Sequence, residues 1–405
     1  MSKILLSILK KSAFLGIILS FSNIFISCSS QTVIVSLDGF RYSYLDSINT
    51  PNLWLMAHEG TLTEMMPSFP SLTFPNHYTL ATGLYPEHHE LIHNNYYNRT
   101  SHKEYSVGND ERLNPENYGG DPIWFTAERQ GKKVGVLYWV ANEITHPGEK
   151  SFMKKTWAQT PHITFEQRVD STINWIGSKK CDLVMTYFEE PDATGHHHGP
   201  HSLEVKNKVH YLDSLMGCLY KGLKALPNAK RINLIITSDH GMASVPASHN
   251  INPNDYIKKE WYSYLTGNIP SMFYVNNDIK DPTAKIDSIY NHLSKVPHLY
   301  VWRKNEIPDS LNYSDNTNIG DILVLPEVGW QFGTKPHYNG GAHGFAPQNH
   351  QMHVPLIAIG HDFKTKFKNR NIIENVNIYP LLCHLLKINP SKCDGTKENT
   401  QELLR

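Results

Sequence analysis

Five short apolar runs rich in β-branched residues constrain the fold of this chain more than any other feature. They occupy residues 32–37, 133–138, 183–188, 232–237 and 355–359. Each run is too short for an ordinary helix and has the composition of a strand buried on both faces. Segments of helical composition, such as 163–176 and 203–226, lie between the runs. Strands that alternate with helices predict an α/β fold, with a mostly parallel central sheet and helices on both faces.

Two stretches depart from this alternation. Residues 94–118 are rich in Asn, Tyr and Gly, which predicts a long surface loop. Residues 245–338 contain short strand-like pieces at 272–275, 300–303 and 322–325. We interpret residues 245–338 as an inserted small subdomain. The whole of residues 29–405 is then expected to form one body, since large α/β proteins often carry insertions.

The first 28 residues have the composition of an export signal. Three lysines precede a mostly apolar stretch at 13–26, which is shorter than the roughly 20 residues that span a membrane. Ser27 followed by Cys28 resembles a bacterial lipoprotein processing site. We therefore expect an exported chain in the periplasm or cell envelope, anchored to a membrane through a lipid on Cys28. An ordinary secretory signal without a lipid is the alternative.

The formal net charge is zero, which gives no bulk attraction to nucleic acid, and no nucleic-acid platform is expected. The 23 histidines are unusual, and imidazole suits zinc and similar metals. After Cys28 the chain has no Cys-x-x-Cys pattern, so a thiolate metal site is not expected. Cys383 and Cys393 are the most plausible disulfide pair of an exported chain.

Acidic residues follow three of the predicted strands. Asp38 closes the first run, Asp192 comes just after the third, and Asp239 follows the fourth. In an open parallel sheet, ligands bind outside the carboxyl ends of the strands. Each aspartate alone fits a turn residue, but together they predict one shared acidic rim.

Histidines accompany these aspartates. His196 is four residues after Asp192, so one helical turn would place both on the same face. His240 is adjacent to Asp239, and His343 lies among glycines, which allow the backbone to approach a metal closely. Oxygen and imidazole ligands without thiolate favour Zn²⁺, with Mn²⁺ or iron as alternatives.

Thr73 lies where a polar loop meets a predicted helix. Pro75 is compatible with a first helical turn, which places Thr73 at or just before the helix start. The free N–H groups and the dipole of a helix N-terminus favour an anion beside the hydroxyl. A hydroxyl is a weak nucleophile, so it needs a base or a metal. The competing interpretation is an ordinary capping threonine.

Together these motifs resemble the nucleotide pyrophosphatase/phosphodiesterase family of the alkaline phosphatase superfamily. The motifs are DGFR at 38–41, TFPNH at 73–77, TGLYPE at 82–87, EEPD at 189–192, GH at 195–196, DHGM at 239–242 and HG at 343–344. The resemblance implies an alkaline-phosphatase-like α/β fold. It also implies a hydrolase that splits nucleotide phosphoanhydrides or phosphodiesters to nucleoside 5′-monophosphates.

The resemblance also implies two Zn²⁺ ions per chain. One ion would be held by Asp192, His196 and His343, and the other by Asp38, Asp239 and His240 with the Thr73 oxygen. Thr73 would attack phosphorus and form a phospho-threonine intermediate. Asn94 and the backbone N–H of Phe74 would stabilise the developing charge.

The expected substrate is a phosphodiester, which carries a single negative charge. A dianionic monoester is bound best by an arginine that donates two parallel hydrogen bonds, and nothing near Thr73 provides one. Phe74 and the Tyr138–Trp139 turn are expected to sandwich a nucleotide base. A choline- or glycerol-type phosphodiesterase on the same site is the alternative among enzymes. Alternatives of other classes are a non-catalytic surface-binding lipoprotein and a zinc-storing protein. The sequence leaves the oligomeric state open.

Overall fold

The computed structural model describes residues 30–145, 152–159, 161–276 and 278–405. The expected export signal and Cys28 lie outside these residues. Within the part of the chain that is described, no helix is both long and apolar enough to cross a membrane.

A nine-stranded sheet forms the centre of the main body, and its strands run in the order β18-β2-β17-β8-β1-β7-β5-β6, with β19 also paired to β2. The bounds are β1 Gln31–Leu37, β2 Thr61–Met66, β5 Val134–Leu137, β6 Met153–Lys155, β7 Leu183–Phe188, β8 Ile232–Thr237, β17 Val354–Gly360, β18 Phe367–Lys368 and β19 Ile373–Glu374. Strand β1 lies at the centre, parallel to both β7 and β8, and β7 is parallel to β5. All seven residues of β1 are buried, which explains its continuous apolar composition. The predicted mostly parallel α/β sheet is confirmed.

One predicted strand runs in the other direction. Strand β17 is antiparallel to both of its neighbours, β2 and β8, so its inclusion among parallel strands was wrong. The apolar pattern of β17 indicates that the strand is buried, and a buried strand has this pattern whether it runs parallel or antiparallel to its neighbours. The direction follows from the path of the chain, because β17 is entered from the end of the sheet where β8 leaves it. Among the described residues between β8 and β17, no helix packs against the central sheet as a crossover that returns the chain to the opposite end.

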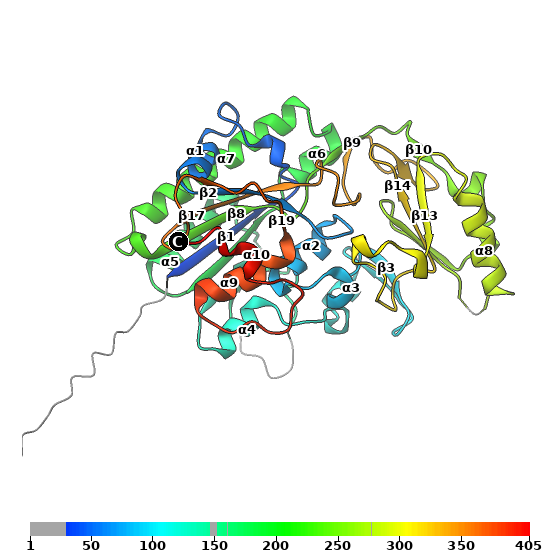
Figure 1. The fold of residues 1–405 in the computed structure, drawn as a ribbon, viewed down its shortest axis with the longest axis horizontal. Helices are drawn as coiled ribbons and strands as arrows, with labels where there is room; N and C mark the ends of the chain where they lie inside the picture. The colour runs from blue at the N-terminus through cyan, green and yellow to red at the C-terminus, as the bar shows by residue number, and fades with distance from the viewer. Residues whose placement is uncertain (1–29, 146–151, 160, 277) are drawn as a thin grey trace, which may run out of the picture.

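Two sets of helices cover the sheet (Figure 1). On one face, helix α7 (Leu203–Lys224) contacts both α1 (Pro51–Glu59) and α5 (Phe165–Gly177). Helices α2 (Thr73–Thr82), α4 (Ile123–Arg129) and α9 (Ile378–Leu386) contact one another on the other. Helix α5 begins with a capping box between Thr164 and Gln167, which satisfies backbone N–H groups of its first turn.

A second, smaller sheet lies beside the main body (Figure 1). Its strands run in the order β11 (Tyr264–Thr266), β12 (Ser271–Tyr274), β14 (Ile322–Pro326) and β13 (Leu299–Arg303), and α8 (Pro282–Leu293) packs against it. This sheet has its own hydrophobic cluster, which includes Phe273, Ile289 and Val324. All of these elements fall within the stretch 245–338 that the sequence singled out.

Part of the expected surface loop at 94–118 is a β-hairpin instead. Strands β3 (Asn95–Asn98) and β4 (Lys103–Ser106) pair antiparallel. Tyr96 stacks on Tyr105 at 4.8 Å, and Tyr97 stacks on Tyr264 of the smaller sheet at 4.4 Å. The hairpin was missed because cross-strand aromatic pairs stabilise it rather than an alternating apolar pattern.

The disulfide expected between Cys383 and Cys393 is not formed, and Cys181, Cys218, Cys383 and Cys393 are all free. Cys383 is buried in α9, and burial raises the pKa of its thiol to about 12. A buried, protonated thiol is chemically inert, so Cys383 acts as a small core residue.

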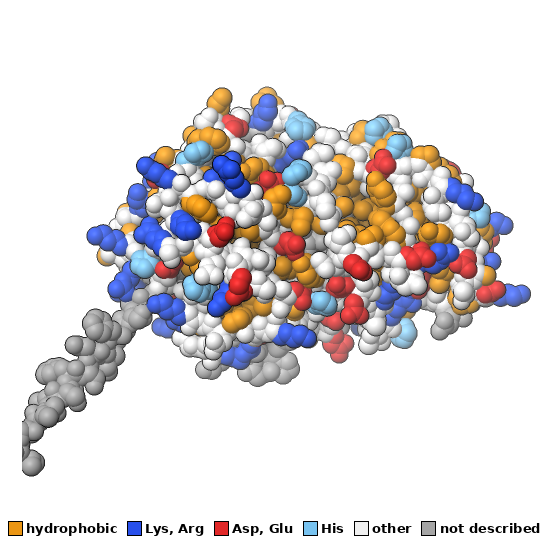
Figure 2. All heavy atoms as spheres, viewed as in Figure 1, with side chains coloured by type: hydrophobic (Ala, Val, Ile, Leu, Met, Phe, Trp, Pro, Cys, Tyr) orange, Lys and Arg blue, Asp and Glu red, His pale blue; other side chains and the backbone are white. Residues whose placement is uncertain are grey.

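One face of the molecule carries charges of both signs (Figure 2). On the face drawn in Figure 2, Lys and Arg side chains alternate with Asp and Glu over most of the molecule, so that face presents no continuous basic groove. This agrees with the zero net charge of the sequence.

Candidate functional site

The three aspartates predicted to share a rim do so. Asp38 follows β1, Asp239 follows β8, and Asp192 begins α6 (Asp192–His198) just after β7. The Asp192 N–H donates to the Asp38 carbonyl at 3.0 Å, and the Gly39 N–H donates to Asp239 Oδ1 at 3.2 Å. Gly39 has a φ of +67°, and a Cβ there would lie 3.0 Å from the Asp192 backbone. Only glycine therefore allows this close approach of the two loops.

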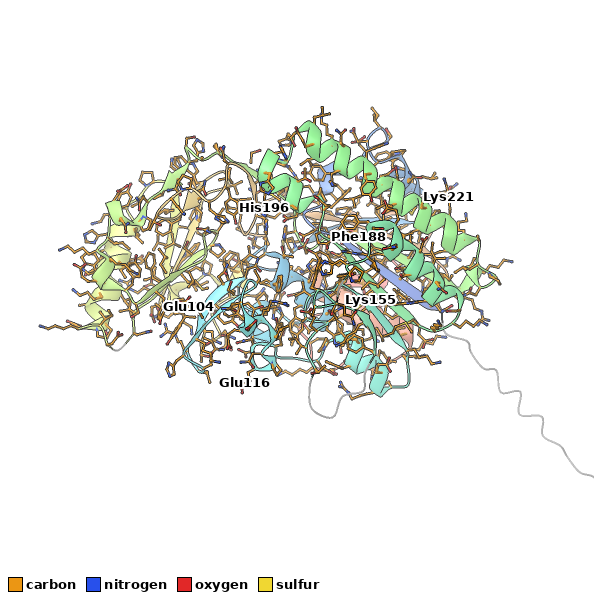
Figure 3. The ribbon with its side chains drawn as sticks, turned by 180° about the vertical axis from the view of Figure 1, so that it is seen from behind. Glu104, Glu116, Lys155, Phe188, His196 and Lys221 are labelled. Atoms are coloured by element: carbon orange, nitrogen blue, oxygen red, sulfur yellow. The ribbon has the colours of Figure 1, made fainter. Side chains whose placement is uncertain are left out.

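Asp192, His196 and His343 form the first half of the cluster. His196 Nε2 lies 3.2 Å from Asp192 Oδ2 across one turn of α6, as the spacing predicted. His343 Nε2 lies 3.4 Å from Asp192 Oδ1 and 3.1 Å from His196 Nε2. Figure 3 labels His196 on α6, between the ends of the central strands and the smaller sheet. A Cβ on Gly341 would lie 2.6 Å from the Gly195 carbonyl, so glycine is needed where this strand, β16 (Gly340–Ala342), meets α6.

Asp38, Asp239 and His240 form the second half. His240 Nε2 lies 3.1 Å from Asp239 Oδ2 and 3.4 Å from Asp38 Oδ1. The His240 ring stacks on the His343 ring at 3.6 Å, which joins the two halves. Ligand atoms of Asp192, His240 and His343 also lie within 4.8 Å of one another. The six side chains, which we call the metal cluster, are therefore continuous.

Hydrogen bonds to the backbone orient all three imidazoles of the metal cluster. The Nδ1 atoms of His196, His240 and His343 lie 2.8, 2.8 and 2.9 Å from the carbonyl oxygens of Gly341, Gly241 and Ser71. A carbonyl only accepts, so each Nδ1 carries a proton and each ring directs its Nε2 atom toward the cluster. This orientation is the one that metal-binding histidines adopt.

The carboxylates of the metal cluster leave buried oxygens without a partner. Asp38 Oδ1, Asp192 Oδ1 and Asp239 Oδ2 are buried and accept no hydrogen bond. Such orphaned acceptors are costly unless a cation satisfies them. These oxygens and the three Nε2 atoms are a donor set that fits zinc.

The ionisation of the cluster agrees with this fit. Burial raises the pKa of Asp38 well above its usual range, and the carboxylates of Asp239 and Asp192 add to the increase. Burial lowers the pKa of His343 to about 3, so its imidazole is neutral. Burial also raises the pKa of Asp192, but the imidazoles of His196 and His343 outweigh it and bring that pKa down to about 2. Crowded carboxylates beside a neutral imidazole favour a bound cation.

Thr73 is the first residue of α2, as predicted, and its Oγ1 lies 3.1 Å from His240 Nε2. The residue preceding the helix is Leu72, and no side-chain capping bond is present there. The hydroxyl of half-buried Thr73 therefore points to the metal cluster and does not cap the helix, which argues against the ordinary capping threonine.

Asn94 and Phe74 meet beside Thr73, but they bond to each other. The Phe74 N–H, expected to face a phosphate oxygen, donates to Asn94 Oδ1 at 3.2 Å. The amide NH₂ of half-buried Asn94 is then the group of this pair that is left to donate to a substrate oxygen.

Tyr138 and Trp139 do not lie where a base could stack on them. Their side chains are 1% and 0% exposed. Trp139 Nε1 donates to the His77 carbonyl at 3.0 Å, and Tyr138 packs under the guanidinium of Arg168, which is 3.9 Å from the ring centroid. The expectation that these two residues bind the substrate needs correction, because neither ring has a free face.

The structure adds four residues that were not among the predicted site residues. The Tyr187 hydroxyl donates to Asp38 Oδ2, and His77 Nδ1 lies 3.3 Å from Asp239 Oδ2. Tyr338 stacks on His196 at 5.1 Å. The half-buried Trp157 ring lies 6.3 Å from the Tyr187 ring. His77 alone had a local signal, since it is four residues after Thr73 on one helix face.

Tyr187→Phe removes the hydroxyl that orients Asp38. We expect zinc affinity to fall about 10–100-fold, because partners of metal ligands usually contribute that much. Competition with a chromophoric chelator measures this affinity. Tyr274→Phe is the matched control, since it removes a buried hydroxyl that donates to the Asn318 carbonyl at 2.8 Å in the smaller sheet. Equal zinc affinities of the two variants would contradict the role of Tyr187.

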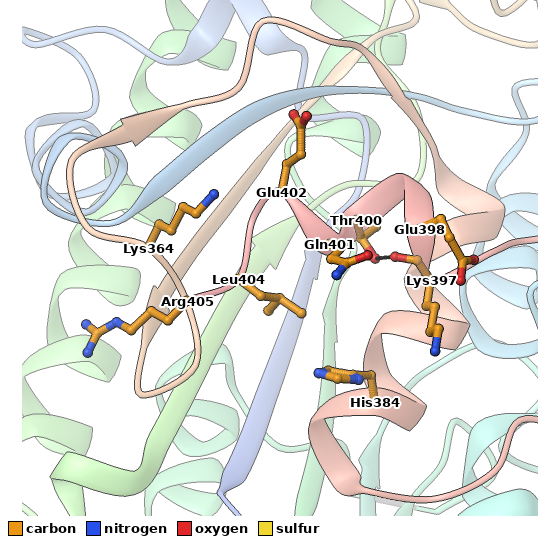
Figure 4. Close-up of a pocket in the computed structure, with 9 residues that line it drawn as sticks. All are labelled: Lys364, His384, Lys397, Glu398, Thr400, Gln401, Glu402, Leu404 and Arg405. Carbon is orange, nitrogen blue, oxygen red and sulfur yellow. Dashed lines mark hydrogen bonds between the residues drawn. The ribbon is translucent and has the colours of Figure 1, made fainter.

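A surface pocket of about 760 Å³ lies away from the cluster, beside the short helix α10 (Glu398–Gln401) (Figure 4). Its lining includes Lys364, His384, Glu398 and Arg405. None of the predicted site residues lines this pocket. The chemistry indicated by the sequence therefore belongs to the metal cluster.

Known proteins match this chain over most of its length. The family described as type I phosphodiesterase / nucleotide pyrophosphatase matches residues 32–346. Ectonucleotide pyrophosphatase/phosphodiesterase family member 7 of Rattus norvegicus is 33% identical over 390 residues, which are 93% of this chain and 87% of that protein. A venom phosphodiesterase of Macrovipera lebetinus is 32% identical over 388 residues, which are 93% of this chain and 45% of that protein.

Solved structures agree with the sequence comparison. Murine ectonucleotide pyrophosphatase / phosphodiesterase 5, an inactive variant in complex with AMP, superimposes with a TM-score of 0.85 at 30% identity. The match covers 93% of this chain and all of that chain, as does the match to the human protein of the same name.

Proposed function

The chain belongs to the type I phosphodiesterase / nucleotide pyrophosphatase family and is a hydrolase, and from that premise we propose how it works. It cleaves nucleotide phosphoanhydrides or phosphodiesters and releases nucleoside 5′-monophosphates. The observation that supports this most is the Thr73 hydroxyl, 3.1 Å from His240 Nε2 in a cluster with three orphaned carboxylate oxygens. Residues 29–405 form one catalytic domain that carries the smaller sheet as an insertion.

Two zinc ions fit the metal cluster. Asp192, His196 and His343 would hold one, and Asp38, Asp239 and His240 with Thr73 Oγ1 would hold the other. When bound, such a pair supplies positive charge that makes hydroxyl groups and water more acidic and neutralises the phosphate. The imidazoles are already oriented for this role, because their Nδ1–H groups are held by carbonyls.

In the first step, Thr73 Oγ1 attacks phosphorus. The bond between Oγ1 and phosphorus forms, the bond from phosphorus to the leaving oxygen breaks with its electron pair going to that oxygen, and the hydroxyl proton passes to solvent. The product is a phospho-threonine that carries the nucleoside group. The Asn94 amide donates to a non-bridging oxygen as negative charge develops, and the N-terminus of α2 adds its positive dipole end.

In the second step, water cleaves the bond between Oγ1 and phosphorus. The nucleoside 5′-monophosphate leaves, and Thr73 regains a proton on its hydroxyl. A neutral asparagine suits a phosphodiester, whose non-bridging oxygens share a single negative charge, better than it suits a dianionic monoester.

Trp157 replaces Tyr138 and Trp139 as the candidate that faces Phe74 across a nucleotide base. Both rings are half-buried. Phe74 follows Thr73, and the Trp157 ring lies 6.3 Å from the ring of Tyr187, whose hydroxyl donates to Asp38. Aromatic rings stack on every nucleobase, so they give affinity without demanding one base. The murine relative solved with AMP supports a nucleotide ligand for this site.

We expect Phe74→Ala and Trp157→Ala to raise the KM for a p-nitrophenyl nucleotide ester by about 5–150-fold, since a base stack contributes about 1–3 kcal/mol. Neither variant is expected to change turnover of a p-nitrophenyl phosphocholine ester. Trp302→Ala, a half-buried ring on β13, is the control. A wild-type protein that prefers the choline ester would instead favour the choline-type alternative.

We also propose that the chain is exported and anchored in the cell envelope through Cys28. The names of its relatives, ectonucleotide and venom enzymes, support an extracellular site of action. Labelling with palmitate tests the anchor. Label that persists on Cys28→Ala would contradict it.

A further inference from the structure

A second group of metal-binding side chains lies outside the metal cluster. Glu64 on β2 meets His350 and His353, which precede β17, and one ligand atom from each lies within 4.8 Å of the others. His353 Nδ1 is 2.6 Å from Glu64 Oε1, and His350 Nδ1 is 3.1 Å from the same oxygen. The two rings lie 4.7 Å apart. We call these three residues the rear triad.

The backbone holds the rear triad in place. Strands β2 and β17 pair antiparallel with Glu64 opposite Pro355, which brings Glu64 beside His353. A turn joins the two histidines, since the His353 N–H donates to the His350 carbonyl at 3.2 Å. The His353 side chain is 2% exposed and that of His350 is 76% exposed, so one ligand is buried and one faces solvent.

The hydrogen bonds of His353 require a positive charge beside its Nδ1 atom. Its Nε2 lies 2.8 Å from the Pro347 carbonyl and must donate to it, so a neutral ring has its lone pair on Nδ1. That lone pair points at a carboxylate oxygen, which is also an acceptor. Two acceptors at 2.6 Å repel each other unless a proton lies between them or a metal ion beside them binds both.

We propose that Glu64, His350 and His353 bind a divalent cation of the zinc class, separate from the ions of the metal cluster. Two imidazoles and one carboxylate without thiolate are a known zinc donor set, and water completes the coordination on the exposed side. Exposed His350 provides the entry path for the ion. The competing state is an ion pair in which a proton on His353 takes the place of the metal.

A cation here would stabilise the loops that carry the metal cluster. The Gly241 and Met242 N–H groups, just after His240, donate to the carbonyls of Met352 and Gln351 at 2.8 and 3.0 Å. The Tyr42 N–H, four residues after Asp38, donates to the His353 carbonyl at 2.9 Å. The ion would thus fix the segment to which both loops are bonded.

Zinc stoichiometry tests the proposal. The full mature chain is equilibrated with Zn²⁺ at a buffered free concentration that saturates the wild type, and bound zinc is counted by elemental analysis. We expect His350→Ala and Glu64→Gln each to bind one zinc ion per chain fewer than the wild type. His350 is exposed, so its variant is expected to fold, and circular dichroism confirms this before the count.

His361→Ala is the matched control. His361 is half-exposed and also lies 2.8 Å from a single carboxylate, that of Asp362, but it is not part of a group of three ligands. We expect this variant to bind as much zinc as the wild type. If His350→Ala and Glu64→Gln do so as well, the proposal is overturned and the protonated ion pair is correct. The count does not depend on turnover, so it is independent of whether the proposed hydrolysis is right.

Discussion

Thr73→Ala is expected to lower kcat by about 10⁴–10⁶-fold, because it removes the proposed nucleophile while the six side chains of the metal cluster remain. The Thr73 side chain does not cap α2, so its loss leaves the backbone hydrogen bonds of the helix intact. We therefore expect nearly unchanged Tm and zinc content. Hydrolysis of a p-nitrophenyl nucleotide ester, followed by absorbance, measures the change.

Thr73→Ser is the matched control for this result, since it keeps a hydroxyl at the same position and should retain most of the activity. Acid quenching of the wild type during turnover, followed by mass spectrometry, should find the nucleotide on the peptide that contains Thr73. Near wild-type turnover by Thr73→Ala would show that another group attacks phosphorus. The zinc content of that variant then distinguishes a wrong nucleophile from a damaged cluster.

Removal of bound metal by a chelator should abolish activity, and Zn²⁺ should restore it. In the metal-free protein, Asp38, Asp192 and Asp239 each keep a buried oxygen without a partner. That arrangement leaves the substrate phosphate facing carboxylates rather than cations, and it also costs stability. We therefore expect Tm to fall together with activity, and both to recover on addition of zinc.

Asp239→Asn is expected to weaken metal binding by a substitution in place of a chelator. An asparagine can keep the oxygen that accepts from the Gly39 N–H and the Ser238 hydroxyl, but it removes the negative charge beside His240. We expect weaker zinc binding and a loss of activity that excess zinc partly reverses. Full activity in the chelated wild type would show that the cluster does not work through a metal.

The central strands could be predicted because each carries its own signal. Strands β7 and β8 occupy the predicted residues, and β1 and β5 differ from the prediction only at their ends. The short edge strand β6 was missed, since its three residues have no apolar pattern. The direction of β17 could not be predicted from its residues either. An apolar run indicates that a strand is buried, but it does not indicate from which end the chain enters the sheet.

The site residues also divide into those that the sequence could predict and those that it could not. The six residues of the metal cluster could be named because each lies at the end of a strand, one helical turn away or among glycines. Tyr138 and Trp139 were placed wrongly, since nothing local says whether a ring that follows a strand turns inward or outward. Trp157 reaches the rim only because β6 pairs with β5. Tyr187 was missed because it lies in β7, whose residues are all buried and whose sequence has the apolar pattern of a core strand.

The sequence by itself determined the central strands β1, β5, β7 and β8, the start of α2 at Thr73 and the chemical character of the cluster, because these depend on residues close together in the chain. Only the tertiary structure decided which buried oxygens lack partners and which nitrogen of each imidazole faces the cluster. It also decided that Glu64 meets His353. Those features depend on strand register and loop paths between distant residues, for which a periodic pattern carries no information.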